Sequence, residues 1–393
     1  GEAGTGAVSD EMLSGYGLDI PMDGMETGAS TGKGIDMNDE DAIGKEDVSG
    51  AGWPDLDLGV NIGDMALAAA SLNSSNYVEP KPEDAISEYW RDNSSHPADH
   101  IAGGSFNTAM DILNMNCGIV NFAPLKEYFM SIYTGAKSVV PMTLLPALNL
   151  PLQRSLAVSE DNKSGSLPVL ANYLLEDLSN NELKLALKHM TTPNFEEAQK
   201  SFRKIMHALL FVVLANKKEE KDAKELLRCC AEYVTATRLE ITRGSLKDSN
   251  PGRSCELAAY FTRCKLNSAH VILSLASAMS VNFKAENFIL AGEFAKRLLK
   301  LNCPPKMQQQ ATFVAQQAQA KNSNKHTINY DDKNPFVLCN IDLVPIYSGS
   351  PSVKCGYCGS SFLPKHQGKL CTVCDIAQIG MQNLPGLQVY KNE

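Results

Sequence analysis

The chain has 393 residues, with 45 Asp and Glu against 36 Lys and Arg, and 11 cysteines. Its longest uninterrupted apolar run covers eight residues, 208–215, whereas a membrane-spanning helix needs about 20. The acidic, glycine-rich start has neither the basic nor the apolar region of a secretory signal, and an odd number of scattered cysteines is untypical of a disulfide framework. We therefore expect a cytosolic protein with reduced thiols and no transmembrane segment.

Charge divides the chain into two unequal parts. Residues 1–90 hold 19 Asp and Glu against 3 Lys and Arg, while the remaining residues hold 26 against 33. Half of the 28 glycines fall within the first 63 residues, and such a segment cannot bury enough apolar surface to offset the entropy lost on ordering. We predict a disordered acidic arm over residues 1–75. Its one apolar patch, Trp53 with Leu56, Leu58 and Val60, is either a short docking motif or an apolar island in a linker.

The next region, residues 76–325, is predicted to be an α-helical body. Apolar residues recur at helical spacing over 101–115, 124–133, 168–190, 195–205, 218–239, 254–263, 270–279 and 305–320. Asn194 precedes one of these segments and Glu197 follows three positions later, which predicts an N-cap with a capping box. The fold class is therefore mainly α.

One apolar pattern occurs twice in this body. Phenylalanine, alanine and aliphatic residues recur at spacings of 3, 4 and 3 in both segments: Phe195, Ala198, Phe202 and Ile205, then Phe288, Ala291, Ala295 and Leu298. Small residues opposite large ones are typical of the close-packed helical hairpins of tetratricopeptide (TPR) repeats. The offset of 93 residues is not a multiple of 34, so we predict an irregular stack of TPR-like helical hairpins.

Residues 138–168 interrupt the helical pattern with four prolines. Aliphatic residues alternate there with turn residues, which predicts extended chain or a hairpin. An apolar excursion of this length between helices usually packs against something, and we take Leu144, Leu145 and Leu148 as candidate anchors for a partner protein.

The last region, residues 326–393, is predicted to be a small β module. Two short apolar runs, 336–338 and 343–347, are separated by turn residues. Phe336 and Tyr347 in these runs are the second candidate contact surface for a partner. We expect this module to have a core of its own, separate from that of the helices.

The strongest chemical signal is a doubled cysteine motif. Cys355-x-x-Cys358 and Cys371-x-x-Cys374 are separated by twelve residues, the arrangement of a Cys₄ zinc ribbon. Four protein ligands leave no position for water, so the expected cofactor is a structural zinc ion rather than a catalytic one. The alternatives are unmetallated thiols or a redox pair.

The functional interpretation of other residues near this motif is less specific. His366 lies between the two cysteine pairs, where it could replace one ligand, although we interpret it as an exposed loop residue. Lys354, Lys365 and Lys369 could offset the negative charge of a zinc-thiolate centre.

The sequence shows no phosphate-binding glycine loop and no local nucleophile, base and acid arrangement, so we do not expect an enzyme. A zinc ribbon also allows nucleic-acid binding. The lysines here are not interleaved with a stacking aromatic platform, however, and the chain is acidic overall, so we expect no nucleic-acid partner.

Several unrelated motifs in one order resemble the carboxy-terminal region of coatomer alpha subunits. They are PADHIAGGSF at 97–106, CELAAYFT at 255–262, FAKRLL at 294–299 and NYDDKNPF at 329–336. The resemblance implies a scaffold of the COPI vesicle coat that binds the epsilon coatomer subunit in Golgi–ER and intra-Golgi transport. It also implies peripheral, cytosolic attachment to Golgi membranes and COPI vesicles, with other coat subunits bound by an amino-terminal part of the family's chain that is absent here.

Two alternative functions remain from the residues alone. One is a nucleic-acid-associated zinc-ribbon protein, which would be retained on heparin in a salt-dependent way. The other is a free TPR-like adaptor that binds peptides, which would be stable and monodisperse without a partner.

Overall fold

The computed structural model describes residues 94–140, 148–151 and 173–389. The predicted acidic arm over 1–75 therefore lies outside the described residues, as do Leu144 and Leu145. The described chain is mostly helical with a few short strands, which confirms the predicted fold class.

The first described elements are three helices and a β-hairpin: α4 (Pro97–Ala102), α5 (Phe106–Cys117), α6 (Lys126–Gly135), β1 (Lys137–Val140) and β2 (Leu148–Pro151). A short 3₁₀ turn, η1 (Ala123–Leu125), leads into α6. Gly118 ends α5 at φ 68°, a left-handed conformation that glycine adopts without steric cost. β1 and β2 pair antiparallel, with Lys137 opposite Pro151. The prediction of a hairpin in this region is confirmed for the strands that the structure describes.

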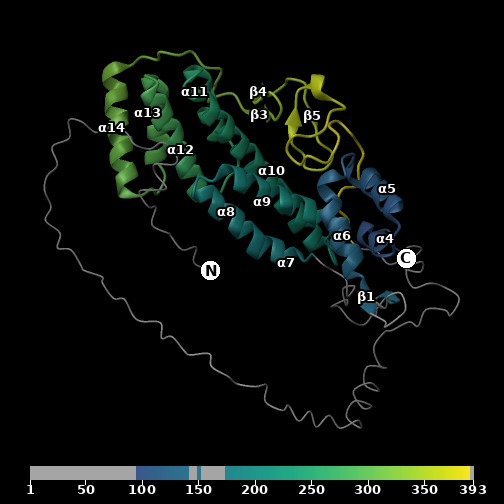
Figure 1. The fold of residues 1–393 in the computed structure, drawn as a ribbon. Helices are drawn as coiled ribbons and strands as arrows, with labels where there is room; N and C mark the ends of the chain where they lie inside the picture. The colour runs from purple at the N-terminus through teal and green to yellow at the C-terminus, as the bar shows by residue number, and fades with distance from the viewer. Residues whose placement is uncertain (1–93, 141–147, 152–172, 390–393) are drawn as a thin grey trace, which may run out of the picture.

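The body continues as an irregular stack of helices in which consecutive elements pack against each other (Figure 1). Its elements are α7 (Leu175–Asp177), a π-helical turn η2 (Leu178–Glu182), α8 (Leu183–Thr191), α9 (Phe195–Ala208), a 3₁₀ turn η3 (Leu209–Phe211), α10 (Lys217–Leu246), α11 (Pro251–Phe261), α12 (Ser268–Lys284), α13 (Phe288–Leu299) and α14 (Pro305–Lys321). The helix predicted from residue 168 is described from Leu175, and residues 168–172 lie outside the described part. The predicted irregular helical stack is confirmed.

The repeated apolar pattern supplies the contacts between helices. Ala198, Ala291 and Ala295 are fully buried, so the helix backbones can approach closely. Phe202 of α9 stacks on Tyr233 of α10 with ring centroids 4.7 Å apart. Large aromatic side chains thus fill the space that the alanines leave, as the sequence pattern predicted.

The predicted cap of α9 is confirmed only in part. The Asn194 side chain accepts a hydrogen bond from the Glu197 N–H at 3.5 Å. The capping box is wrong, because the Asn194 N–H donates to the carbonyl of His189 and the Glu197 carboxylate pairs with Lys200 at 2.7 Å. The preceding helix ends so close to Asn194 that its last turn supplies the acceptor.

Short strands and one 3₁₀ turn make up the C-terminal module: β3 (Phe336–Cys339), β4 (Val344–Tyr347), β5 (Val353–Lys354), β6 (Ser361–Phe362) and η4 (Pro364–His366). β3 pairs with β4 and β5 pairs with β6, both antiparallel. The prediction of a small β module is confirmed.

This module does not have a separate core, so that expectation was wrong. One continuous hydrophobic cluster joins buried residues of α5, α9 and α10 to Tyr357, Val373 and Ile376 of the module. Figure 1 shows the module, in yellow, lying against α10 and beside α5. Its short strands bury too little apolar surface by themselves, so the module completes its core against the helices.

Candidate metal centre and the helices that hold it

The first cysteine pair lies on a tight loop between β5 and β6. The Cys355 N–H donates to the Ser360 carbonyl at 2.9 Å, and the Gly359 N–H closes the turn on the Cys355 carbonyl at 3.1 Å. Gly359 has a φ of 73°, a left-handed conformation that favours glycine. The turn directs Cys355 and Cys358 to the same side, where both are buried.

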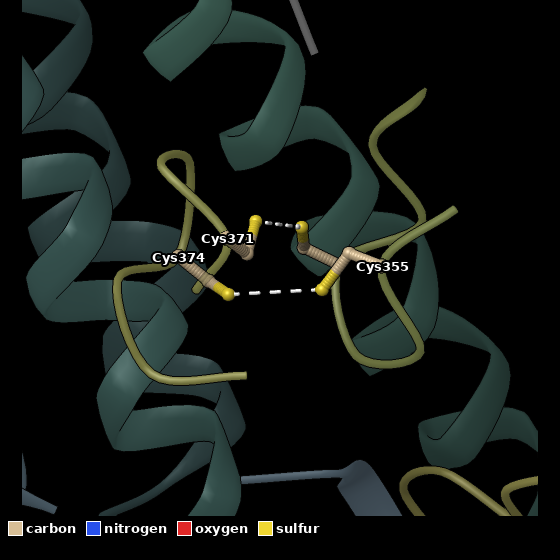
Figure 2. Close-up of side chains that lie close together, drawn as sticks. Cys355, Cys371 and Cys374 are labelled. Atoms are coloured by element: carbon tan, nitrogen blue, oxygen red, sulfur yellow. Dashed lines mark hydrogen bonds between the residues drawn. The ribbon is translucent and has the colours of Figure 1, made fainter. Parts of the chain in front are cut away.

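The second pair lies on a matching loop. The Cys371 N–H donates to the Ala377 carbonyl at 2.8 Å, and the Asp375 N–H donates to the Cys371 carbonyl at 2.9 Å. Cys371 and Cys374 are fully buried. The two loops face each other, so four cysteines that are 13 to 19 residues apart across the pairs converge (Figure 2).

The sulfur positions fit a tetrahedral metal site. The Sγ atoms of Cys355 and Cys374 are 3.8 Å apart, those of Cys358 and Cys371 are 3.6 Å apart, and all four lie within 4.8 Å of one another. A tetrahedral site with metal–sulfur bonds of about 2.3 Å has edges of roughly 3.8 Å, whereas a disulfide needs about 2.05 Å. The predicted four-cysteine cluster is therefore assembled in space, and it has the donor set of a metal site.

Burial and hydrogen bonding shift the pKa values of these thiols in opposite directions. It raises the pKa of Cys371 and of Cys374 well above the usual thiol range. Burial also raises the pKa of Cys358, but hydrogen bonds from the neighbouring thiols outweigh it and lower that pKa well below its usual value. A negative charge on Cys358 is thus already stabilised inside the cluster, and a cation would replace the remaining thiol protons.

Helix α9 holds the second cysteine loop through its backbone. The Arg203 guanidinium donates from Nε to the Val373 carbonyl at 3.0 Å and from Nη2 to the Thr372 carbonyl at 2.7 Å. One turn later the His207 ring nitrogen Nε2 lies 2.7 Å from the Cys374 carbonyl. Burial lowers the pKa of His207, which favours a neutral ring that donates from Nε2. Three consecutive carbonyls of this loop are therefore bound by one helix face.

Further hydrogen bonds join the module to α9, to α10 and to the segment after α5. Tyr357 is buried and donates its hydroxyl to the Met206 carbonyl at 2.5 Å. Arg238 of α10 donates to the carbonyl of Asn340 and, at 2.7 Å, to the hydroxyl of Thr372. The segment after α5 also pairs with the module, with the Val120 N–H donating to the Ile376 carbonyl and the Gln378 N–H to the Gly118 carbonyl. The four-cysteine cluster is therefore held by the helical body on several sides.

Two of the three lysines expected to offset the cluster's charge have other partners. Lys365 pairs with Asp342 at 2.8 Å, and the Lys369 ammonium lies 3.3 Å from Nδ1 of His366. The interpretation of His366 as an exposed loop residue was wrong, because its ring is buried and its Nε2 lies 2.9 Å from Asp342. Instead, Arg203 and Arg238 bring positive charge to the second cysteine loop.

The candidate partner residues occupy different environments. Leu148 lies on β2. Phe336 and Tyr347 are opposite each other across β3 and β4, with ring centroids 5.5 Å apart, and Phe336 also contacts the rings of Tyr260 and Tyr330. These two aromatic side chains are half-buried and contribute to the junction between the helices and the module.

Sequence reasoning missed Arg203, His207 and Tyr357. A signal was present for the first two, since Arg203 and His207 lie four residues apart on α9 next to the apolar positions Phe202 and Met206. Charged and titratable residues at the edge of a buried helix face need polar partners. The sequence did not show that these partners would be carbonyl groups about 170 residues away.

The fold is that of a mainly α-helical protein, an irregular stack of helical pairs with a four-cysteine module packed on its side. The chain belongs to the family described as the C-terminus of the coatomer (COPI) alpha subunit, whose model matches residues 3–393. The resemblance in its motifs is thereby confirmed.

Several curated relatives of this chain are coatomer alpha subunits. The coatomer subunit alpha of Dictyostelium discoideum is 42% identical over 322 residues, which is 80% of this chain and 25% of that protein. Coatomer subunit alpha-1 of Arabidopsis thaliana is 37% identical over 95% of this chain and 31% of its own length. Coatomer subunit alpha of Saccharomyces cerevisiae is 29% identical over 88% of this chain and 28% of its own length. The chain thus spans about a quarter to a third of these relatives.

Within the described residues, none of the helices combines the length and the apolar character needed to cross a bilayer.

Proposed function

We propose that this chain is a scaffold region of the COPI coat that binds the epsilon coatomer subunit, with the β1–β2 hairpin as the contact. Membership of the coatomer alpha family supports the coat role. The hairpin is proposed as the contact because of its own marginal stability. A two-stranded sheet is at best marginally stable alone, so a partner that covers its edge would stabilise it, and a concave helical superhelix can capture an extended segment of this kind.

The wider setting follows from the same family. As part of a coat subunit, the chain would act in Golgi–ER and intra-Golgi transport, on the cytosolic side of Golgi membranes and COPI vesicles. It would attach peripherally through the assembled coat, with other coat subunits bound by the rest of the full-length protein. Its role would be structural rather than catalytic.

The four-cysteine cluster is proposed to hold one structural zinc ion through Cys355, Cys358, Cys371 and Cys374. Burial, tetrahedral edge lengths and an all-thiolate donor set support zinc. The ion would hold the two cysteine loops together, so that α9 and α10 bind a preformed surface. Elemental analysis of freshly purified, reduced protein should find the ion, and absence of zinc would contradict this part.

Partner binding is tested by co-purification with the epsilon subunit. Changing Leu145 and Leu148 to Asp should weaken a one-to-one complex at least about 100-fold, because charge would enter an apolar interface. The matched control is Leu185→Asp on α8, where the side chain is 49% exposed and the fold should tolerate the change.

A second substitution examines the other candidate surface. Phe336 and Tyr347 support the fold, so Val337→Asp is the better probe of that surface, since Val337 follows Phe336 on β3 and is 49% exposed. Loss of binding with this variant alone would move the contact to the β module. If the unaltered chain does not bind the epsilon subunit, the proposed function fails. Salt-dependent retention on heparin would then favour the nucleic-acid alternative.

A further inference from the structure

A third turn in the module has the same backbone geometry as the two cysteine loops. It spans Cys339 to Asp342, and the Leu343 N–H closes it by donating to the Cys339 carbonyl at 2.8 Å. The equivalent bonds close the Cys355 and Cys371 turns at 3.1 and 2.9 Å. Two residues separate the possible ligands in each of the three turns. The Cys339 turn is therefore built like a metal-binding turn, with a carboxylate in the place of the second thiol.

The residue that follows each turn strengthens this equivalence. Gly359, Asp375 and Leu343 have φ values of 73°, 63° and 54°. A left-handed conformation is ordinary for glycine and tolerated by aspartate, but it is strained for leucine. The Leu343 backbone is nevertheless held in it, with its side chain buried. Strain of this kind persists where the surroundings over-determine the conformation, as they do at binding sites.

A third possible ligand reaches the same place. Nε2 of His366 lies 2.9 Å from Oδ2 of Asp342, which lies 3.8 Å from Sγ of Cys339, and the three donor atoms are within 4.8 Å of one another. Cys339 is fully buried and His366 nearly so. The Leu363 N–H points at Sγ of Cys339 at 3.4 Å, an amide-to-sulfur contact that stabilises a thiolate.

The two groups of possible ligands alternate along the chain. Cys339 and Asp342 come first, then the Cys355 pair, then His366, and then the Cys371 pair. The Cys339 group is therefore closed by segments on both sides of the Cys355 pair, and the four-cysteine cluster is closed by segments on both sides of His366. Two ions bound in this interleaved way would cross-link a module that has only short strands.

We propose that Cys339, Asp342 and His366 form a second metal site, which takes one zinc-type divalent cation. Sulfur, oxygen and nitrogen donors of these types are the protein ligands of zinc. Three protein ligands leave a fourth position for water, and the Asp342 side chain is 26% exposed, so solvent reaches it. The site differs in this from the four-cysteine centre, whose ligands are all buried protein groups.

Binding requires a defined exchange of protons and cations. The Cys339 thiol releases its proton to solvent as the sulfur–metal bond forms, and His366 binds through Nε2 and carries its proton on Nδ1. In the metal-free form two lysines provide the positive charge next to these ligands. Lys365 lies 2.8 Å from Oδ2 of Asp342, and Lys369 lies 3.3 Å from Nδ1 of His366. Both lysines must therefore move away as the ion binds, Lys365 from the Asp342 carboxylate and Lys369 from the newly protonated Nδ1 of His366. The Lys365 side chain is 63% exposed and Lys369 is also exposed, so neither movement requires repacking. The short contact between Asp342 and His366 would then open to about 3.4 Å, the edge expected for bonds near 2.1 Å.

The experiment is a zinc titration of the metal-free, reduced chain, followed by native mass spectrometry. We expect two zinc ions per chain for the unaltered protein, and one for Asp342→Asn and for His366→Gln. The matched control, Asp332→Asn, removes a half-exposed carboxylate that pairs with Arg263, and it should still bind two ions. Circular dichroism checks that each variant is folded.

A variant that gains affinity keeps the test independent of folding defects. Lys365→Ala removes the cation that competes for Asp342, so the second ion should bind several-fold more tightly. A single ion at about 100 μM zinc that both the unaltered chain and His366→Gln retain would overturn the proposal, and so would two ions in His366→Gln. Unchanged affinity of the second ion in Lys365→Ala would also place that ion elsewhere. None of these results depends on binding of the epsilon subunit.

Discussion

Replacing Arg203 by methionine would remove the charged contact between α9 and the second cysteine loop. The guanidinium donates two hydrogen bonds, at 3.0 and 2.7 Å, to the Val373 and Thr372 carbonyls. Hydrogen bonds from charged donors contribute about 1.5–3 kcal/mol each. Since Arg203 is only half-buried, water would compensate in part, and we expect a net loss of about 2 kcal/mol. Methionine keeps the apolar stem, so packing of α9 should change little.

The loss should be measurable as weaker metal binding. The two bonds orient the loop that carries Cys371 and Cys374, and removing such supporting contacts typically lowers metal affinity about 10- to 100-fold. Competition with a chromophoric zinc chelator measures the affinity, and circular dichroism measures the helix content, which should stay unchanged. Lys200→Met is the control, because Lys200 lies one turn earlier on α9 with a side chain that is 71% exposed. Equal zinc affinity of Arg203→Met and the unaltered chain would refute the reasoning, and would mean that the loop is held without α9.

Two other predictions concern the helical stack. Burial lowers the pKa of His270 to about 4, so between that value and about 6.5 the unfolded chain binds more protons, and stability falls as the pH is lowered through this window. Because of this residue, urea denaturation should give a free energy of unfolding about 2 kcal/mol lower at pH 5 than at pH 7. His270→Gln should remove this contribution of about 2 kcal/mol to the pH dependence. The same pH dependence in the variant and the unaltered chain would contradict the prediction. Gly292→Ala should lower stability by about 1–3 kcal/mol, because its Cβ would lie 2.6 Å from that of Ala318 on α14. Gly244→Ala on α10 meets nothing within 4 Å and should be neutral or slightly stabilising in the same thermal denaturation experiment; similar melting temperatures for both variants would show that α13 and α14 can separate at little cost.

Much of this protein is determined locally by its sequence. The helical period located the helices from α5 to α14, although α10 continues to Leu246, beyond its predicted end at residue 239, and α12 continues to Lys284, beyond residue 279. Asn194 marked the start of α9 correctly. The doubled cysteine spacing identified Cys355, Cys358, Cys371 and Cys374 as one cluster, because a two-residue separation within a turn brings both sulfurs to one side. These features depend on residues that are close in sequence, so the spacing of residue types is enough to predict them.

The tertiary structure decided how these parts are joined. Arg203 lies about 170 residues from the carbonyls that it binds, and no periodic pattern predicts a contact of that separation. The module shares its core with the helices because its strands are too short to bury one alone, which turned an expected separate unit into part of the body. The same packing buried His366 beside Asp342 and Cys339. Each of these residues is ordinary in sequence, and only the folded backbone brings their polar atoms within bonding distance of one another.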